Sequence, residues 1–491
     1  MAHHLLPLIR QTFVMTSAIF QTLVCGLILG FPTILFAALT QPDSDIKVDE
    51  NTATTIVAIR GIGFFTFSIL IFVVLQKIGR RRTQILSVLP GIAGWILCYF
   101  AHSALQLMVM HVMLGLHLGA ALSVVTMVIG EYSSPRYRGV FLMVKTAFIA
   151  SGVATVHILG AYFHWRIVAL MALIPNVLSL AIAPFWPESP YWLASVGRFD
   201  ECIAAFYWLR GKGAEDQEEL DDLLNKHKER IAAEGTNQGI MRSIMRHLMY
   251  LKNRDFLKLV LLVMMMNNLV EFSGRYVLNT YSISILQTIT DSQDMAYKIT
   301  IFLDLLTLVL SFATAILVKV MKRRTILFST SLMSMVCLFI CSLLLYLKTH
   351  NMIPSYFKWV AIIIYSVYIA AMSIGVLPIV IGYFGEIFPV LYKPLAGMLV
   401  GAYGVALNSF MNKVTPPLMT GLGPHGTFLV FAISMFLCLC FLYPNLPETK
   451  DRTLQDIENK WEVECGRTKN TKRHSVNTEM VLLSKKNIDQ P

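Results

Sequence analysis

Charged residues are scarce in this chain. Only 14% of its 491 residues are Asp, Glu, Lys or Arg, whereas 55% are hydrophobic, and its mean hydropathy is +0.61. A soluble globular domain carries about a quarter charged residues, so the composition excludes an ordinary soluble protein. The net charge of +11 is explained by a one-sided distribution of Lys and Arg and by the tail, and it gives no reason to expect nucleic acid as a partner.

Several catalytic and ligand-binding patterns are also absent. The sequence has no GxGxxG-type nucleotide loop and no Walker motif, which argues against ATP-driven pumping. It shows no nucleophile–base arrangement, so we do not expect an enzyme. Its eight cysteines lack the Cys/His spacing of a metal site, and none falls in an expected outer loop. We therefore expect no metal, no cofactor and no structural disulfide.

Long apolar runs recur along the whole chain. A transmembrane helix needs roughly 20 largely apolar residues, and the sequence predicts twelve such spans. The first is too long, and lacks the cleavage site, for a removable signal peptide. The predicted spans cover residues 11–38, 54–76, 84–103, 105–130, 139–162, 165–186, 257–287, 297–318, 325–347, 357–386, 395–419 and 426–446.

Basic residues mark one side of this expected all-α membrane protein. Lys and Arg gather in the short segments after spans two, four, eight and ten, whereas the first loop on the opposite side is acidic, with Asp43, Asp45, Asp49 and Glu50. Because the positive side of a membrane protein is cytoplasmic, we expect both termini and the 187–256 loop to lie in the cytoplasm.

Three motifs occur twice. GRRRT at 79–83 returns as KRRTI at 322–326, GEYSSPRYRG at 130–139 returns as GEIFPVLYKP at 385–394, and PESPYW at 187–192 returns as PETKDR at 447–452. Each copy follows the equivalent span, which indicates a duplication of six spans. Parallel repeats of this kind place a substrate path between two halves that rock against each other.

The repeat divides the chain into four parts. The loop between the halves shows helical periodicity with acid-to-base spacings, as in EDQEELDDLLNKHKERI. The expected parts are an N-terminal six-helix bundle (1–186), a cytoplasmic loop with short helices (187–256), a C-terminal six-helix bundle (257–446) and a cytoplasmic tail (447–491).

Taken in order, the motifs resemble the sugar porter family of the major facilitator superfamily. They are G-R-R-R after span two, G-E-x-S-x-P-x-x-R-G after span four, P-E-S-P-Y-W-L after span six, G-E-I-F-P after span ten and P-E-T-K after span twelve. RQTFVMTS, the acidic first loop and GEIFP look most like insect facilitative trehalose transporters. The resemblance covers residues 10–460, and implies two six-helix bundles that work by alternating access, with the monomer as the functional unit.

The shared motifs imply a cytoplasmic gate. Opposite charges at the helix ends can form bidentate pairs that lock the gate and release it as the halves rock. A plainer alternative is that they only orient the protein and solvate helix ends, which leaves the paired glutamates unexplained. Lys319 and Lys322 depart from the family pattern, so we expect a looser or rewired second lock. The candidate gate residues are Arg80, Arg81, Glu131, Arg138, Glu188, Arg323, Arg324, Glu386, Lys393 and Glu448.

This chain departs from most positions at which the family holds a sugar. The family uses neutral amides there, because an amide both donates and accepts hydrogen bonds. The two glutamines of the span-seven Q-Q-L-S-G pattern become Val270 and Glu271, the span-ten acid becomes Ser373, and Asn408 matches an asparagine. The candidate substrate-binding residues are Thr146, Glu271, Arg275, Tyr276, Thr307 and Asn408.

Glu271 and Arg275 stand four residues apart in the apolar stretch MMMNNLVEFSGRYVLN at 264–279. In a continuous helix they share a face, and charges within a membrane nearly always face the protein interior or an aqueous cavity. Two interpretations stay open. Either Glu271 accepts substrate hydroxyls or a cation while Arg275 tempers its charge, or the two form a structural pair that satisfies itself.

Other ionisable residues also fall inside the predicted spans. We expect Arg60 and Asp304 to reach the outer membrane surface, and Lys145 the cytoplasmic one, by extending along their helices. We expect His157 to be packed and neutral, because an intramembrane charge is costly.

The resemblance implies facilitated rather than proton-coupled transport. Symporters of the family use an acid in span one and an arginine in span four, and here these positions are Pro32 and His111. His111 leaves pH sensitivity open, although a packed neutral histidine is favoured. We expect facilitated diffusion of a small polar solute, a sugar of the trehalose or hexose class, across the plasma membrane. The alternatives are a carrier of another small organic solute or cation through Glu271, and a solute sensor that does not transport.

Overall fold

The structure is a computed structural model that describes residues 2–41, 44–211, 213–234, 254–352, 354, 357–388 and 393–448. Most of these residues are helical, and the described ranges contain no strand. In a lipid environment the backbone has no water to bond, so an apolar run satisfies its own amides and carbonyls within a helix.

The first half of the chain forms one bundle. A Phe31–Trp95 pair in T-shaped contact, with ring centroids 5.0 Å apart, lies in its core. Its elements are α1 (Ala2–Leu39), α2 (Glu50–Ala58), α3 (Arg60–Ile78), α4 (Arg80–Tyr99), α5 (Ala104–Tyr132), α6 (Pro135–Tyr162), α7 (Trp165–Ile182) and the 3-10 turn η1 (Ala183–Phe185).

Three short helices follow, namely α8 (Pro190–Ser195), α9 (Phe199–Arg210) and α10 (Ala214–Glu234). They are tied to each other and to the first bundle. Tyr191 donates to Glu219 at 2.8 Å, and burial together with this bond raises the pKa of Tyr191 to about 12. Arg210 donates to the carbonyl of Ser133 at 3.0 Å, and so fastens the end of α9 to the end of α5. Residues 235–253 of the predicted loop lie outside the described residues.

The second half forms the other bundle. Its core includes Tyr365 and Tyr368, which are stacked with ring centroids 5.9 Å apart. Its elements are α12 (Arg254–Phe272), α13 (Arg275–Thr280), α14 (Ser282–Thr290), α15 (Gln293–Val320), α16 (Arg323–Thr349), α17 (Phe357–Ala371), the π-helical turn η3 (Met372–Val376), α18 (Leu377–Ile387), α19 (Lys393–Gly421) and α20 (Gly423–Asn445).

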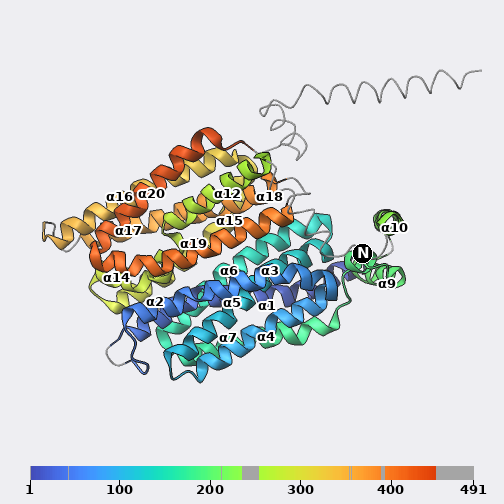
Figure 1. The fold of residues 1–491 in the computed structure, drawn as a ribbon, viewed down its shortest axis with the longest axis horizontal. Coiled ribbons are helices and arrows are strands. Elements are labelled where there is room, and N and C mark those ends of the chain that lie inside the picture. The colour runs from blue at the N-terminus through green and yellow to red at the C-terminus, as the bar shows by residue number, and fades with distance from the viewer. Residues whose placement is uncertain are drawn as a thin grey trace, which may run out of the picture.

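The two bundles lie side by side with their long helices roughly parallel (Figure 1). One end of the molecule carries α9, α10 and the N-terminus, on the right of Figure 1, and we name it the α9 end. The opposite end carries α14 and the loop between α1 and α2, and we name it the α14 end. This arrangement sets the frame for every contact described below.

Nine helical stretches of the described chain are long and apolar enough to cross a membrane. They account for part of the twelve predicted spans. Three further helices, α3, α4 and α19, run alongside these nine (Figure 1). They are not among the nine, and α4 opens with three arginines.

Three predicted spans are interrupted rather than continuous. The span predicted at 54–76 divides at Ile59, between α2 and α3. The span predicted at 257–287 divides into α12, α13 and α14, and the span at 357–386 contains the π-helical turn η3. Hydropathy measures how apolar a run is and does not register local backbone breaks, so these interruptions were missed.

Candidate functional site

A backbone break separates Glu271 from Arg275. Helix α12 ends at Phe272, and Gly274 takes a left-handed conformation, with φ of +79°, before α13 begins at Arg275. A Cβ at Gly274 would come within 2.6 Å of the Phe431 ring, so only glycine fits this turn without strain. The prediction that Glu271 and Arg275 share one helical face is therefore wrong, because no continuous helix joins them.

Arg275 does not neutralise Glu271. The two side chains, both described, form no ion pair within 4.0 Å. Arg275 instead lies within electrostatic reach of Tyr365 and Tyr368 of α17. Tyr368 also donates to the carbonyl of Ser273 at 2.8 Å, which satisfies a carbonyl at the break. The interpretation of a structural pair that satisfies itself is wrong.

The partner of Glu271 is Asn408 of α19. Its amide donates to the two carboxylate oxygens at 3.0 and 3.3 Å. Asn412, one turn further along α19, donates to the Asn408 side-chain oxygen at 3.1 Å and so orients the amide. Glu271 is only 6% exposed, so this amide is a large part of what offsets the cost of burying its polar oxygens.

The Glu271–Asn408 contact belongs to a longer polar line. Asn267 donates to the carbonyl of Val400 at 3.3 Å, and Tyr403 donates to Asn268 at 2.6 Å. We name these contacts, with Glu271–Asn408, the α12–α19 ladder. The prediction missed Asn267, Asn268, Tyr403 and Asn412. The sequence contained a signal for the two asparagines. They stand three and four residues before Glu271, and residues at these spacings are neighbours on the surface of a helix.

The other three candidate substrate residues are placed differently. Tyr276 is half-buried at the start of α13 and within electrostatic reach of both Glu271 and Arg275. Thr307 of α15 accepts a hydrogen bond from Ser373 of η3 at 3.4 Å, and π-helical turns often mark functional sites. Thr146 is exposed on α6, and its hydroxyl donates to its own helix at Leu142.

Contacts between the two halves close the α14 end. Thr33 of α1 donates to the carbonyl of Asn279 at 3.0 Å. The rings of Phe36 and Tyr281 meet in T-shaped contact, with centroids 4.8 Å apart. Lys413 of α19 bonds Asn51, Thr54 and Thr55 of α2, at 2.5–3.3 Å.

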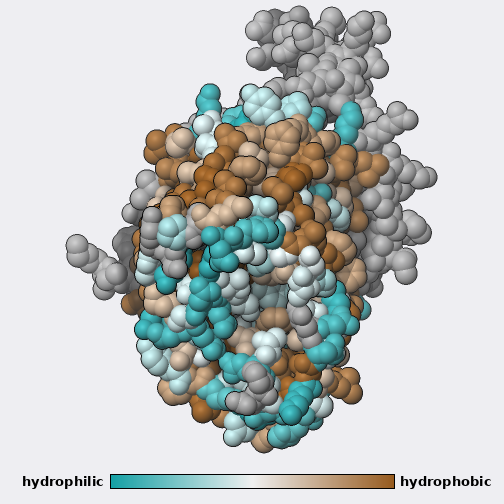
Figure 2. All heavy atoms as spheres, turned by 90° about the vertical axis from the view of Figure 1, so that its left-hand side faces the viewer, coloured by the Kyte–Doolittle hydropathy of each residue, from teal (hydrophilic) through white to brown (hydrophobic). Residues whose placement is uncertain are grey.

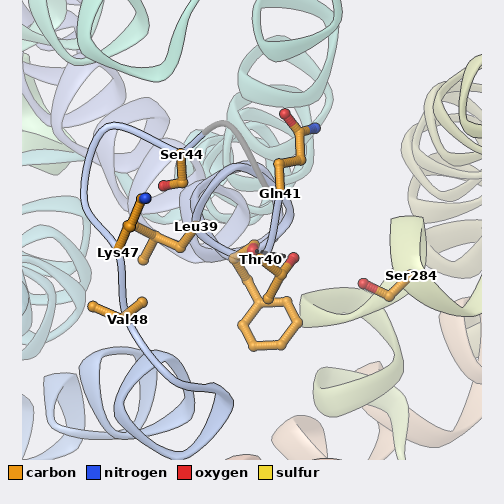
Figure 3. Close-up of a pocket in the computed structure, with 8 residues that line it drawn as sticks. Leu39, Thr40, Gln41, Ser44, Lys47, Val48 and Ser284 are labelled. Atoms are coloured by element: carbon orange, nitrogen blue, oxygen red, sulfur yellow. Dashed lines mark hydrogen bonds between the residues drawn. The ribbon is translucent and has the colours of Figure 1, made fainter.

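A shallow hollow of about 480 Å³ lies above this closure. Figure 2 shows the α14 end face on, with hydrophilic side chains gathered around a central recess and over the first half. In Figure 3 the hollow is bordered by Thr40, Gln41, Ser44 and Lys47 from the end of α1 and the following loop, and by Ser284 of α14 from the other half. The hollow therefore spans both halves at the point where they meet.

The predictions that Arg60 and Asp304 reach the membrane surface are wrong. Arg60 is 8% exposed and donates to the carbonyl of Ile28 at 2.9 Å. Asp304 is 7% exposed and hydrogen-bonds His157, so His157 is not merely packed. Lys145 donates to Thr126 of α5 at 2.5 Å. Hydropathy and spacing place such residues along a helix, but packing against other helices decides where their side chains point.

Charged groups at the α9 end of the first half form one cluster. Arg80 donates to Glu131 through two nitrogens, at 2.7 and 3.0 Å. The carboxylate of Glu188 accepts from the backbone amides of Arg80 and Arg81, at 2.7 and 3.1 Å, and so caps the start of α4. Gly79 has a φ of +89° here, and a Cβ would lie 2.5 Å from Glu188.

The second half repeats part of this cluster. Glu448 accepts from the backbone amides of Arg323 and Arg324, at 3.2 and 3.1 Å, at the start of α16. Tyr383 donates to the carbonyl of Pro447 at 3.0 Å, as Tyr132 does to that of Pro187 at 3.1 Å. The guanidinium of Arg324 turns to the carbonyl of Tyr443, at 2.6 Å.

Three candidate gate residues remain. The side chains of Glu386 and Lys393 lie outside the described residues. Arg138 is half-buried, and its Nε has no hydrogen-bond partner among the described atoms. The described charge clusters each join helices of a single half.

A second hollow, of about 490 Å³, lies beside the charge cluster of the first half. It is bordered by Arg81, Arg82, Trp186, Trp192, Arg198 and Trp208.

Comparison with known proteins agrees with the predicted resemblance. A facilitated trehalose transporter Tret1 of Apis mellifera ligustica is 28% identical over 396 residues, 80% of this chain and 76% of that protein. The Tret1 of Culex quinquefasciatus is 24% identical over 468 residues, which cover 94% and 88% of the two chains. The chain spans 41% and 52% of the length of the Tret1 proteins of Drosophila virilis and Drosophila yakuba.

Solved structures share the fold. The inward open xylose transporter XylE from E. coli superimposes on this chain with a TM-score of 0.74 at 17% identity. The alignment covers 92% of this chain and 100% of the XylE chain. The proton:xylose symporter XylE bound to 6-bromo-6-deoxy-D-glucose gives 0.71 at 18% identity, over 92% and 99%. This chain therefore shares the fold of these two transporters.

The family assignment rests on a match over nearly the whole chain. The model of the family described as "Sugar (and other) transporter" matches residues 12–461. The predicted resemblance to sugar porters is confirmed, and so is the prediction that the chain is a transporter rather than an enzyme. The chain is an integral membrane protein that belongs to the sugar transporter family.

Proposed function

We propose that this protein carries a sugar of the trehalose or hexose class across the plasma membrane by facilitated diffusion, with alternating access of two six-helix bundles. The observation that carries the proposal is the α12–α19 ladder. It places amide and carboxylate groups of two helices together inside an apolar bundle, and sugar hydroxyls need donors and acceptors of this kind. The trehalose transporters among the relatives support the substrate class.

In this proposal the bundles comprise residues 1–186 and 257–446, and twelve helices cross the membrane, with α3, α4 and α19 added to the nine apolar stretches. The 187–256 loop, the 447–491 tail and the N-terminus are cytoplasmic, because the basic segments gather at the α9 end. The monomer is the functional unit.

The contacts between halves suggest which state is present. Thr33–Asn279, Phe36–Tyr281 and the Lys413 bonds hold the halves together at the α14 end. With the α9 end in the cytoplasm, this is a state that is closed to the outside. The charge clusters at the α9 end each lie within one half, and we infer that they keep each half rigid as it moves.

A second candidate substrate class follows from the charge of Glu271. The carboxylate is held by a neutral amide and is not paired with Arg275. A carboxylate without a cationic partner attracts a cation, so a small organic cation is the rival substrate. Among the described residues, the alternative of a sensor that does not transport has no comparable contact in its favour.

Uptake into proteoliposomes tests the proposal. Purified protein is assayed with radiolabelled trehalose, glucose, fructose and a small organic cation, with and without a protonophore. We expect saturable sugar uptake that the protonophore leaves unchanged. Cation uptake without sugar uptake would replace the first proposal by the second, and loss of sugar accumulation on adding the protonophore would contradict facilitated diffusion.

A further inference from the structure

His157 and Asp304 meet across the two halves of the protein. His157 lies on α6 of the first half and Asp304 on α15 of the second. The imidazole Nδ1 hydrogen-bonds a carboxylate oxygen of Asp304, and Nε2 lies 3.2 Å from the carbonyl oxygen of Gly30 of α1. The two side chains are 0% and 8% exposed, so the contact is shielded from solvent.

The two contacts of the imidazole can both be hydrogen bonds only if the pair holds an additional proton. Both ring nitrogens face oxygen atoms, whereas a neutral imidazole carries one N–H. Both contacts are hydrogen bonds if an imidazolium meets a carboxylate, or if a neutral imidazole meets a protonated carboxyl. The two forms differ only in where the shared proton sits. Each holds one proton more than a neutral histidine beside an ionised aspartate.

Two of the three groups in this contact come from the first half of the protein and one comes from the second half. Gly30 and His157 belong to the same bundle, and Asp304 belongs to the other. Separation of the halves at the α14 end therefore breaks the His157–Asp304 bond and keeps the His157–Gly30 contact. In neutral water a neutral imidazole and an ionised carboxylate are the usual forms of these two side chains. Opening of this end therefore lets the separated pair release the proton that the contact held.

The charged and titratable groups near the His157–Asp304 contact do not take the place of the bound proton. Tyr365 of α17 is within electrostatic reach of Asp304, and Arg275 of Tyr365 in turn. Helix α1 presents the carbonyl of Gly30. Lys298, nearer the α14 end of α15, is exposed and paired with Asp294 at 2.5 Å. The histidines of α5, His111 and His117, contact backbone carbonyls within the first half.

We propose that His157 and Asp304 form a proton-binding site between the halves, which holds the α14 end closed while the proton is bound and releases the proton when that end opens. The proton enters and leaves on the same side of the membrane. The site thus makes the conformational equilibrium depend on outer pH without driving solute accumulation. This goes beyond the proposed function, and it holds for any transported solute.

The direction of the effect follows from proton linkage. The closed state binds more protons, so acid favours it and rising pH favours opening. For one proton released on opening, the ratio of open to closed molecules rises by at most about tenfold for each pH unit.

Spin-label distances measure this ratio directly. Labels at Gln41→Cys and Ser284→Cys sit on opposite halves at the hollow of the α14 end, with Cys440 and Cys465 replaced by Ser in the full-length protein. We expect the long-distance population to grow from pH 6 to pH 8. His157→Gln and Asp304→Asn should abolish this growth. If Asp304→Asn fails to fold, the test rests on His157→Gln, because the glutamine amide can still donate a hydrogen bond to Asp304.

His164→Gln is the matched control. His164 is at the same end and lies 3.6 Å from Asp45, but both residues belong to the first half. The control should keep the full pH dependence. Unchanged distances between pH 6 and pH 8, or unaltered pH dependence in His157→Gln, would overturn the proposal. No sugar is needed in this measurement, so its failure is separate from failure of the transport proposal.

Discussion

Asn408 of α19 donates its amide to Glu271 of α12 at 3.0 Å, and these two residues are 137 positions apart in the chain. The contact joins an interrupted helix to a neighbour whose amide has been turned toward it by Asn412. A carboxylate and amides brought together inside an apolar bundle are what make this place a candidate solute site.

Substitution of Glu271 tests whether this region is the solute-binding site. Glu271→Gln keeps the size of the side chain and removes its charge, so we expect a folded protein with altered uptake. Hydrogen bonds to charged groups contribute about 1.5–3 kcal/mol, so the KM for the sugar should rise roughly 10- to 100-fold. Radiotracer uptake measures it.

Asp294→Asn is the control for Glu271→Gln, because Asp294 is an exposed acid of the same half, paired with Lys298. It should leave uptake unchanged. Uptake by Glu271→Gln equal to that of the wild type would assign Glu271 a structural role.

Lys413 should stabilise the closed α14 end. Its ammonium bonds two oxygens of Asn51 at 2.9 and 2.6 Å, across the boundary between the halves. Lys413→Met removes these bonds while keeping an apolar stem. At about 1.5 kcal/mol or more for a charge-assisted bond, the open population should rise roughly tenfold. Spin-label distances between the halves report the change.

Lys348→Met is the matched comparison for Lys413→Met. Lys348 also bonds carbonyls and Asp291 at the α14 end, but its partners all lie in the second half. We expect its open population to match the wild type. An equal shift in both variants would mean that Lys413 acts only on local stability.

Gly79→Ala should destabilise the protein. The φ of +89° and a Cβ 2.5 Å from Glu188 force either backbone strain or loss of the carboxylate that caps α4. We expect a loss of about 1–3 kcal/mol and a lower Tm in detergent. Gly130→Ala serves as the control, because nothing lies within 4 Å of its Cβ position; equal Tm values for the two variants would contradict this account.

Tyr132→Phe and Tyr383→Phe test the repeated contact. Each removes the hydrogen bond to a proline carbonyl, at Pro187 and Pro447 respectively, and Tyr132→Phe also removes the weaker 3.5 Å contact to Glu188. Each should lower stability by about 0.5–1.5 kcal/mol, which thermal unfolding measures, and the two effects should be similar. A large loss for one and none for the other would show that the halves do not share this support.

Much of the architecture was readable from local pattern. Apolar runs predicted most helices to within a few residues, and the PESP and PETK motifs marked Glu188 and Glu448 as candidates at the same helix ends as the arginines that begin α4 and α16. These features depend on neighbouring residues or on a motif that occurs twice, so a single sequence contains them.

The sequence by itself determined that this is a helical membrane protein built from two similar halves, because lipid forces long apolar runs into helices wherever they occur. Only the tertiary structure decided that Glu271 meets Asn408 and that His157 meets Asp304, 147 residues away. Spacing along one helix cannot select between partners on different helices. That choice depends on the backbone break at Gly274 and on how two bundles pack at the α14 end.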